Sequence, residues 1–188
     1  MTTRLTAEER KRQLVGIGLQ LLIATPLDEL SLDLVAQQAG ISRSLLFHHF
    51  PTKRDYYLAV VRAASRRMVH AVEQPGGDQP RRMTEGLVAF IRRRREPYLA
   101  FVRGSAGGDE AVRQINAETR DELITRFAAA LGLADGDDVG RLQVRGWLAY
   151  TEELVLTWTH DHATDADDPV LVDLLLAALA NLLRPLSP

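Results

Sequence analysis

The stretch from Ser42 to Lys53 brings together side chains suited to contacting duplex DNA. The guanidinium of Arg43 can donate two parallel hydrogen bonds to O6 and N7 of guanine, and the methyl groups of Leu45 can contact the methyl of thymine. His49 and Lys53 are spaced to meet backbone phosphates, which attract cations without regard to sequence. The other candidate DNA-binding residues are hydroxyl, aromatic or imidazole side chains in or near this stretch: Ser31, Ser42, Ser44, Phe47 and His48.

These side chains need a short helix that fits the major groove, preceded by a second helix and a turn. Ser31 is a suitable N-cap for the first helix, with Leu30 and Val35 spaced as a hydrophobic staple. Gly40 fits the left-handed residue that ends this helix, and Ser42 caps the next one. The pattern predicts a helix-turn-helix.

The second helix of this motif has one apolar side. Leu46 and Phe50 are four residues apart, so both should face the core. The exposed arc is then predicted to hold Arg43, Ser44, Leu45, Phe47 and His48.

Capping boxes predict the two flanking helices. Thr6 and Glu9 open a helix that should end near Thr25, because Pro26 follows. Thr52 and Asp55 open another helix, which extends towards residue 70.

Glycine and proline cluster between Gln74 and Pro80, which predicts a linker. Beyond it, apolar periodicity predicts helices near residues 81–94, 97–103, 109–131, 137–160 and 169–183. No strand pattern competes with these. We predict an all-α fold of about nine helices, with a three-helix DNA-binding domain at 1–52 and a larger ligand-binding and dimerisation domain at 53–188.

The charge distribution supports this division. Residues 1–74 contain ten Lys and Arg against seven Asp and Glu, a net +3, and the remaining residues have thirteen against eighteen, a net −5. Only the basic part is expected to meet phosphates. The chain has no cysteine, and neither a secretory signal nor a membrane span is apparent, so we expect a cytoplasmic protein.

The motif resembles the DNA-binding helix-turn-helix of the TetR family. In that family this segment looks like A-G-hydrophobic-S-x-G-x-L-Y-x-H-F, followed by lysine. The resemblance extends over residues 6–60. Two positions depart from the pattern, because Phe47 replaces the usual tyrosine and Ser44 a frequent glycine. The matching positions are Ala39, Gly40, Ile41, Ser42, Leu46, His49, Phe50 and Lys53.

Two apolar helices near the C-terminus predict a homodimer. Their apolar stripes look too wide for the core of a monomer, so we expect them to pair with their copies in a two-fold four-helix interface. A two-fold dimer would bind an operator that is an inverted repeat. The stripes contain Leu154, Val155, Trp158, Leu171, Leu174, Leu175, Ala178 and Leu182.

Aromatic and polar side chains in the middle of the chain suggest a pocket for a small molecule. The resemblance implies that an effector bound there would tilt the helix after residue 52 and release DNA, so repression is the expected role, with activation as the alternative. The candidate pocket residues are Phe90, Tyr98, Phe101, Trp147, Tyr150 and Glu153.

Three other features of the sequence allow different interpretations. The imidazoles of His160 and His162, with the aspartates at 165, 167 and 168, could bind a metal, but an acidic loop explains them more simply. The arginines at 92–95 are expected to form a solvated face with ion pairs to Glu85 or Glu96. We find no catalytic constellation and expect neither an enzyme nor a cofactor. A helical small-molecule carrier without DNA function remains an alternative.

Overall fold

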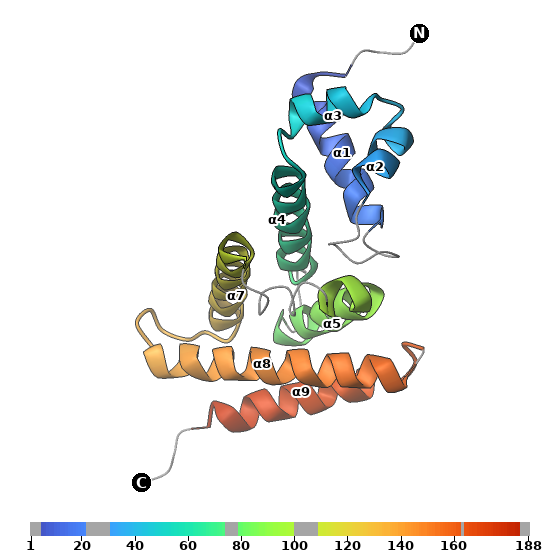
Figure 1. Ribbon diagram of the computed structural model, residues 1–188. Coiled ribbons are helices and arrows are strands. Elements are labelled where there is room, and N and C mark those ends of the chain that lie inside the picture. The colour runs from blue at the N-terminus through green and yellow to red at the C-terminus, as the bar shows by residue number, and fades with distance from the viewer. Residues whose placement is uncertain (1–4, 22–30, 74–78, 100–108, 163, 185–188) are drawn as a thin grey trace. The chain divides into compact units, whose positions relative to one another are not determined.

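The computed structural model describes residues 5–21, 31–73, 79–99, 109–162 and 164–184 (Figure 1). Within these ranges every regular element is a helix, which confirms the predicted all-α fold. Residues 95–99 are also helical. The helices are α1 (Ala7–Leu21), α2 (Leu32–Ala39), α3 (Arg43–His49), α4 (Lys53–Ala71), α5 (Gln79–Arg93), α7 (Glu110–Ala130), α8 (Asp138–Asp161) and α9 (Asp168–Leu182).

The chain forms two compact units, each built from two segments. Unit 1 comprises Met1–Arg66 and Glu96–Ile115, and unit 2 comprises Arg67–Arg95 and Asn116–Pro188. The first part of α4 thus belongs to the same unit as α1 to α3. The division by function at residues 52–53 stays a prediction.

The helix ends in unit 1 follow the capping signals of the sequence. The Thr6 amide donates to Glu9 Oε2 at 2.8 Å, and the Glu9 amide donates to Thr6 Oγ1 at 3.2 Å. This hydrogen bonding lowers the pKa of the Glu9 carboxyl. Gly40 ends α2 with φ 63°, a left-handed conformation that favours glycine. The predicted capping boxes and C-cap are confirmed, whereas Leu30 of the proposed staple and the end of the first helix lie outside the described residues.

The core of unit 1 joins α1, α2, α3 and the first turns of α4. Leu14, Val35, Leu46 and Val60 are fully buried in it, and Phe50 is nearly so, which confirms the predicted inward face of α3. Tyr56 donates its hydroxyl to the Leu14 carbonyl at 2.8 Å, and burial raises the pKa of this phenol. This hydrogen bond and the apolar contacts hold α1 against α4.

In unit 2, α5, α8 and α9 pack against one another. Figure 1 shows α8 and α9 lying side by side. Trp147 of α8 is fully buried and donates its Nε1 proton to the Leu175 carbonyl of α9 at 2.8 Å. Its ring meets Phe127 of α7 edge to face, with the ring centroids 4.9 Å apart.

Helix ends in unit 2 differ from the predictions by one or two residues. The linker was expected to reach Pro80, but α5 already begins at Gln79. Proline suits the first turn of a helix because the missing amide proton would have had no partner there. In unit 1, the helix expected at 97–103 is described only as far as residue 99, and residues 95–99 are helical. None of the described helices is long and apolar enough to cross a membrane.

Candidate nucleic-acid interface

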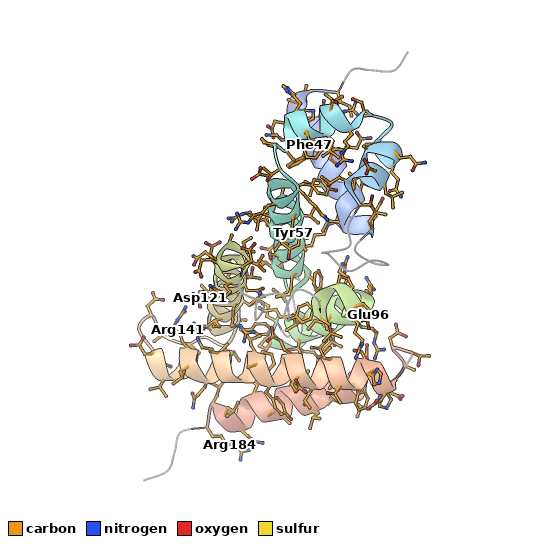
Figure 2. All side chains as sticks on the ribbon, viewed as in Figure 1. Phe47, Tyr57, Glu96, Asp121, Arg141 and Arg184 are labelled. Carbon is orange, nitrogen blue, oxygen red and sulfur yellow. The ribbon has the colours of Figure 1, made fainter. Side chains whose placement is uncertain are left out.

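Helix α3 has a buried side and an exposed side. Leu46 is fully buried, whereas Ser44 and His48 are exposed and Leu45 is 39% exposed. Phe47 is half-buried and packs on the core of unit 1. A helix anchored by its apolar side and open on its polar side is suited to entering a DNA groove. Figure 2 shows the side chains and labels Phe47.

Arg43 stands at the start of the exposed side of α3. Its Nη1 lies 3.0 Å from both carboxylate oxygens of Asp33 in α2, and both side chains are largely exposed. Its guanidinium carbon lies 5.5 Å from the centroid of the Phe47 ring. Its partner Asp33 was not among the predicted site residues. The one sequence feature that could have indicated it is that Asp33 is an acidic residue in a segment with net positive charge.

The two cap serines keep a proton available. Ser31 Oγ accepts from the Leu34 amide at 3.3 Å, and Ser42 Oγ accepts from the Leu45 amide at 3.2 Å. In this role each hydroxyl is an acceptor, so its own proton can still be donated to a phosphate. Both serines are exposed.

His49, at the end of α3, lies in a cationic environment. Partial burial is the main cause that lowers the pKa of its imidazole, and the nearby His48, Lys11 and Arg10 lower it further. Glu8, also on α1, acts in the opposite direction on this pKa, so two cations and one acid of α1 lie near the predicted phosphate contact. The sequence analysis did not assign Lys11 or Arg10 to the site.

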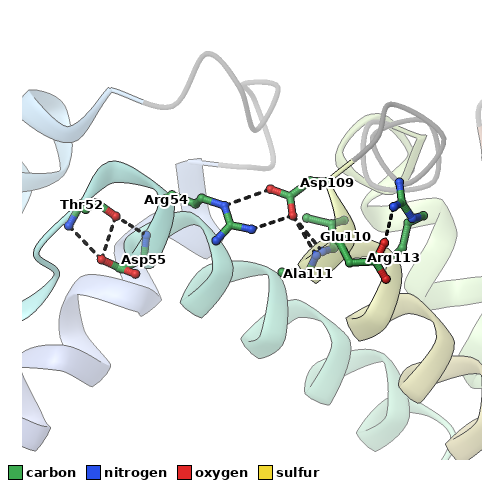
Figure 3. A network of polar contacts seen from close by, with 8 residues as sticks. Thr52, Arg54, Asp55, Asp109, Glu110, Ala111 and Arg113 are labelled. Atoms are coloured by element: carbon green, nitrogen blue, oxygen red, sulfur yellow. Dashed lines mark hydrogen bonds and ion pairs between the residues drawn. The ribbon is translucent and has the colours of Figure 1, made fainter.

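The first turn of α4 is fixed by a polar network (Figure 3). The Thr52 amide donates to Asp55 Oδ2 at 3.0 Å, and the Asp55 amide donates to Thr52 Oγ1 at 3.0 Å. The Arg54 Nη2 donates to Asp109 Oδ1 at 3.0 Å, and Arg54 lowers the pKa of this carboxyl. Asp109 also accepts from the Ala111 amide at the start of α7, at 2.9 Å. These contacts hold the backbone beside Lys53, which is exposed.

The six predicted pocket residues differ in their surroundings. Phe90 and Trp147 are buried in unit 2, whereas Tyr150 and Glu153 are exposed on α8. Tyr98 is buried and belongs to unit 1, and Phe101 lies outside the described residues. Trp147 already has a partner for its only donor, which is typical of a core residue. The pocket stays a prediction.

The alternative metal site and the arginine run have other partners. Asp168 forms an ion pair with Arg92, whose Nη1 also donates to the His162 carbonyl at 2.8 Å. The His162 ring stacks on Trp158 with centroids 3.9 Å apart. Across the described part of the chain no group of three or more His, Cys, Asp or Glu side chains could hold a metal ion. The arginine run was expected to form ion pairs, for instance with Glu85 or Glu96; Arg92 pairs instead with Asp168 at the start of α9.

Comparison with known proteins matches this geometry. A family model described as bacterial regulatory proteins, tetR family, matches residues 17–60. The HTH-type transcriptional activator FasR of Mycolicibacterium smegmatis is 31% identical over 91 residues, which are 47% of this chain and 42% of that protein. The match thus spans less than half the length of this relative.

Similar solved structures extend the comparison beyond the helix-turn-helix. A tetR-family transcriptional regulator from Streptomyces coelicolor has a TM-score of 0.78 and 26% identity, covering 95% of this chain and 80% of that one. The multidrug binding protein EbrR, solved in complex with proflavin, has a TM-score of 0.63 and 18% identity, covering 90% and 99%. Residues 17–60 of this chain are therefore similar to the tetR family of bacterial regulatory proteins, and the chain as a whole has the fold of these solved TetR-family regulators.

Proposed function

We propose that this protein is a transcription regulator that binds double-stranded DNA as a homodimer and responds to a small molecule. The observation that supports DNA binding most directly is the exposed side of α3, where Arg43, Ser44 and Leu45 are open to solvent while Leu46 fixes the helix in the core. Arg43 and Leu45 would read base edges, and His49 and Lys53 would contact phosphates.

Exposed apolar side chains support a dimer built on α8 and α9. On α8, Val139 and Leu142 are 68% and 65% exposed, and on α9 Val170 and Leu174 are 61% and 48% exposed. Exposed large apolar groups gathered on one surface are typical of protein interfaces. Copies related by a two-fold axis would present two α3 helices to an inverted repeat, with half-sites about one helical turn apart.

Part of the predicted interface belongs to the protomer itself. Val155, Leu171 and Leu175 are fully buried within unit 2, so they cannot be the surface that meets a second copy. Sequence periodicity indicated the width of the apolar stripes, but it could not divide them between the inner core and an outer face.

The effector and the direction of regulation are proposed from similar proteins. EbrR has been solved with proflavin, and a similar helical unit here could hold an aromatic molecule. Repression with release by the ligand is our first proposal, and activation is the second, because the relative FasR is an activator. A reporter gene placed downstream of the bound sequence distinguishes the two proposals. Repression predicts that the protein lowers expression of the reporter, and activation predicts that it raises expression.

Selection from a pool of randomised duplexes tests the DNA-binding function. The full chain should enrich an inverted repeat, and fluorescence anisotropy should show tighter binding to that repeat than to random duplex at the same salt concentration. Equal affinity for enriched and random duplexes at every salt concentration would reject the proposal. A helical carrier without DNA function predicts this second result.

A further inference from the structure

The ion pair between Asp33 and Arg43 joins two helices of the proposed DNA-binding motif. Asp33 lies in the first turn of α2 and Arg43 is the first residue of α3. Their side chains are 67% and 60% exposed. An ion pair this open to solvent adds little to stability. Its position on the surface that would face DNA therefore calls for a different explanation.

Only one nitrogen of the Arg43 guanidinium is used by this pair. Nη1 donates to both Asp33 oxygens at 3.0 Å. Within the described residues, Nε and Nη2 of Arg43 have no acceptor, so this edge keeps three N–H donors. Two parallel donors on one edge are what recognition of guanine O6 and N7 requires.

The ring of Phe47 restrains the same guanidinium from another side. The Arg43 guanidinium carbon lies 5.5 Å from the ring centroid, within the range of cation–π attraction. Phe47 packs on the core of unit 1, so its ring is a fixed platform. A long, flexible arginine is thus restrained by a carboxylate and by an aromatic ring before any DNA arrives.

A carboxylate beside DNA has a cost for binding. It repels phosphates, so it weakens the affinity for every sequence alike. An arginine that served only as a phosphate contact would gain nothing from such a neighbour. A base-reading arginine gains, because a preorganised side chain loses less conformational entropy on binding and is held in one orientation.

We infer that Asp33 is a positioning residue for base recognition, which holds the Arg43 guanidinium through Nη1 against Phe47 so that the Nε and Nη2 edge faces a guanine. The inference rests on the proposed DNA-binding function. Asp33 thereby exchanges general affinity for discrimination between bases.

The test compares binding of the full chain and its variants to duplexes selected by the wild-type protein. The base pair read by Arg43 is defined as the one at which R43A loses discrimination. At that pair D33N should lower the preference for the selected base by about five- to tenfold. It should also bind random duplex about two- to threefold more tightly, since one negative charge is gone.

Three further variants separate positioning from a general charge effect. E8Q is the matched control, because Glu8 is an exposed acid paired with Lys11 on α1 and does not touch Arg43. It should raise affinity for all duplexes without changing base preference. D33E keeps the charge and should restore most of the discrimination. In the R43A background, D33N should cause no further loss.

The outcomes distinguish the inference from the function on which it rests. If the wild-type chain selects no sequence, the proposed function fails and the inference fails with it. If it selects a sequence but D33N keeps the wild-type base preference, or changes it no more than E8Q does, only the inference fails. Nuclear magnetic relaxation of the Arg43 Nε–H group gives a readout without DNA, where D33N should increase side-chain motion and unchanged motion would overturn the inference.

Discussion

At the scale of single residues, Arg43 and Lys53 represent two kinds of DNA contact under the proposed function. Arg43 is paired with Asp33 and lies over the Phe47 ring, and in the proposed complex its hydrogen bonds would depend on which base lies opposite. Lys53 is an exposed point charge at the start of α4, and every phosphate attracts it equally. Specificity and affinity should therefore separate when the two are changed independently.

Arg43→Ala should reduce discrimination at one base pair by about 1–3 kcal/mol, because a bidentate contact is lost. Lys53→Ala should weaken binding to all duplexes and lower the slope of log affinity against log salt by about 0.9, one counterion contact. Anisotropy titrations over a salt series measure both. Equal losses on selected and random duplex for Arg43→Ala would identify it as a phosphate contact only.

His49 should make DNA binding depend on pH. Burial and nearby cations hold the pKa of its imidazole below the ordinary value, so the free protein carries it neutral at neutral pH. Phosphates would favour the charged form, so DNA binding takes up a proton and affinity rises as pH falls from 7.5 to 5.5. The wild-type protein and His49→Gln are compared by anisotropy at constant ionic strength, and parallel pH profiles would contradict this role.

The lowered pKa of His49 also makes the stability of the folded protein depend on pH. The pKa of His49 is lower in the folded state than in the unfolded chain. Well above pH 6.5, the ordinary pKa, the imidazole is neutral in both states and does not change the free energy of unfolding. As pH falls below that value, the unfolded chain binds more protons and the folded state loses stability. His49→Gln should flatten this part of the stability profile.

At the scale of elements, α1 packs closely on α4 within unit 1. A Cβ atom added at Gly18 would lie 2.5 Å from the Tyr56 hydroxyl and 2.6 Å from Val60 Cγ2. Tyr56 cannot easily withdraw, because it is buried and bonded to the Leu14 carbonyl. A Cβ atom at Gly16, two residues earlier, would meet nothing within 4 Å.

These two glycines of α1 should respond oppositely to alanine. Gly18→Ala should destabilise the protein by about 1–3 kcal/mol through overpacking. Gly16→Ala should stabilise it by about 0.5–1 kcal/mol, because alanine favours the helix and there is room for the methyl group. Urea unfolding followed by circular dichroism measures both, and shifts of the same sign would contradict the α1–α4 packing.

Two ion pairs connect α5 to α9 and differ in burial. Arg92 and Asp168 are 14% and 15% exposed, and the pKa of Arg92 is raised mainly by its hydrogen bonds to Asp168. Arg81 and Asp173 are 39% and 65% exposed. Because desolvated partners cannot return to water when one is removed, the first pair should matter more to folding.

Arg92→Ala should cost about 2 kcal/mol of unfolding free energy, since it leaves the Asp168 carboxylate and the His162 carbonyl without their donor. Arg81→Ala should cost about 0–1 kcal/mol. Thermal unfolding of both variants at one pH measures the difference. A cost for Arg81→Ala equal to that for Arg92→Ala would show that burial does not distinguish the pairs.

At the scale of the whole molecule, two-fold assembly would convert one α3 into a pair with fixed spacing. The proposed interface uses the exposed apolar residues of α8 and α9, including Leu142 and Leu174. Their neighbours that face inward, such as Leu175, stabilise the protomer instead. Adjacent leucines on one helix would thus have different roles.

Leu174→Glu combined with Leu142→Glu should yield folded monomers in sedimentation velocity, because charge is placed on an apolar interface without entering the core. Leu175→Glu should instead lose the cooperative unfolding transition, since it buries a carboxylate among apolar side chains. A dimer mass retained by the double variant would locate the interface elsewhere.

The sequence by itself determined the local features of this protein. Ser31, Gly40 and Ser42 specify helix ends through bonds to neighbours within a few residues, so their roles follow from position alone. The spacing of Leu46 and Phe50 likewise identified the inward side of α3.

Only the tertiary structure decided which distant residues meet. Asp33 pairs with Arg43 across a turn and Arg92 with Asp168 across two helices, and no local rule selects these partners among many charges. The tertiary structure also showed that Trp147 and Leu175 are buried while Tyr150 and Leu174 are exposed. Sequence periodicity could not separate them, because the apolar stripe of a helix has the same period whether it packs within the chain or against another copy.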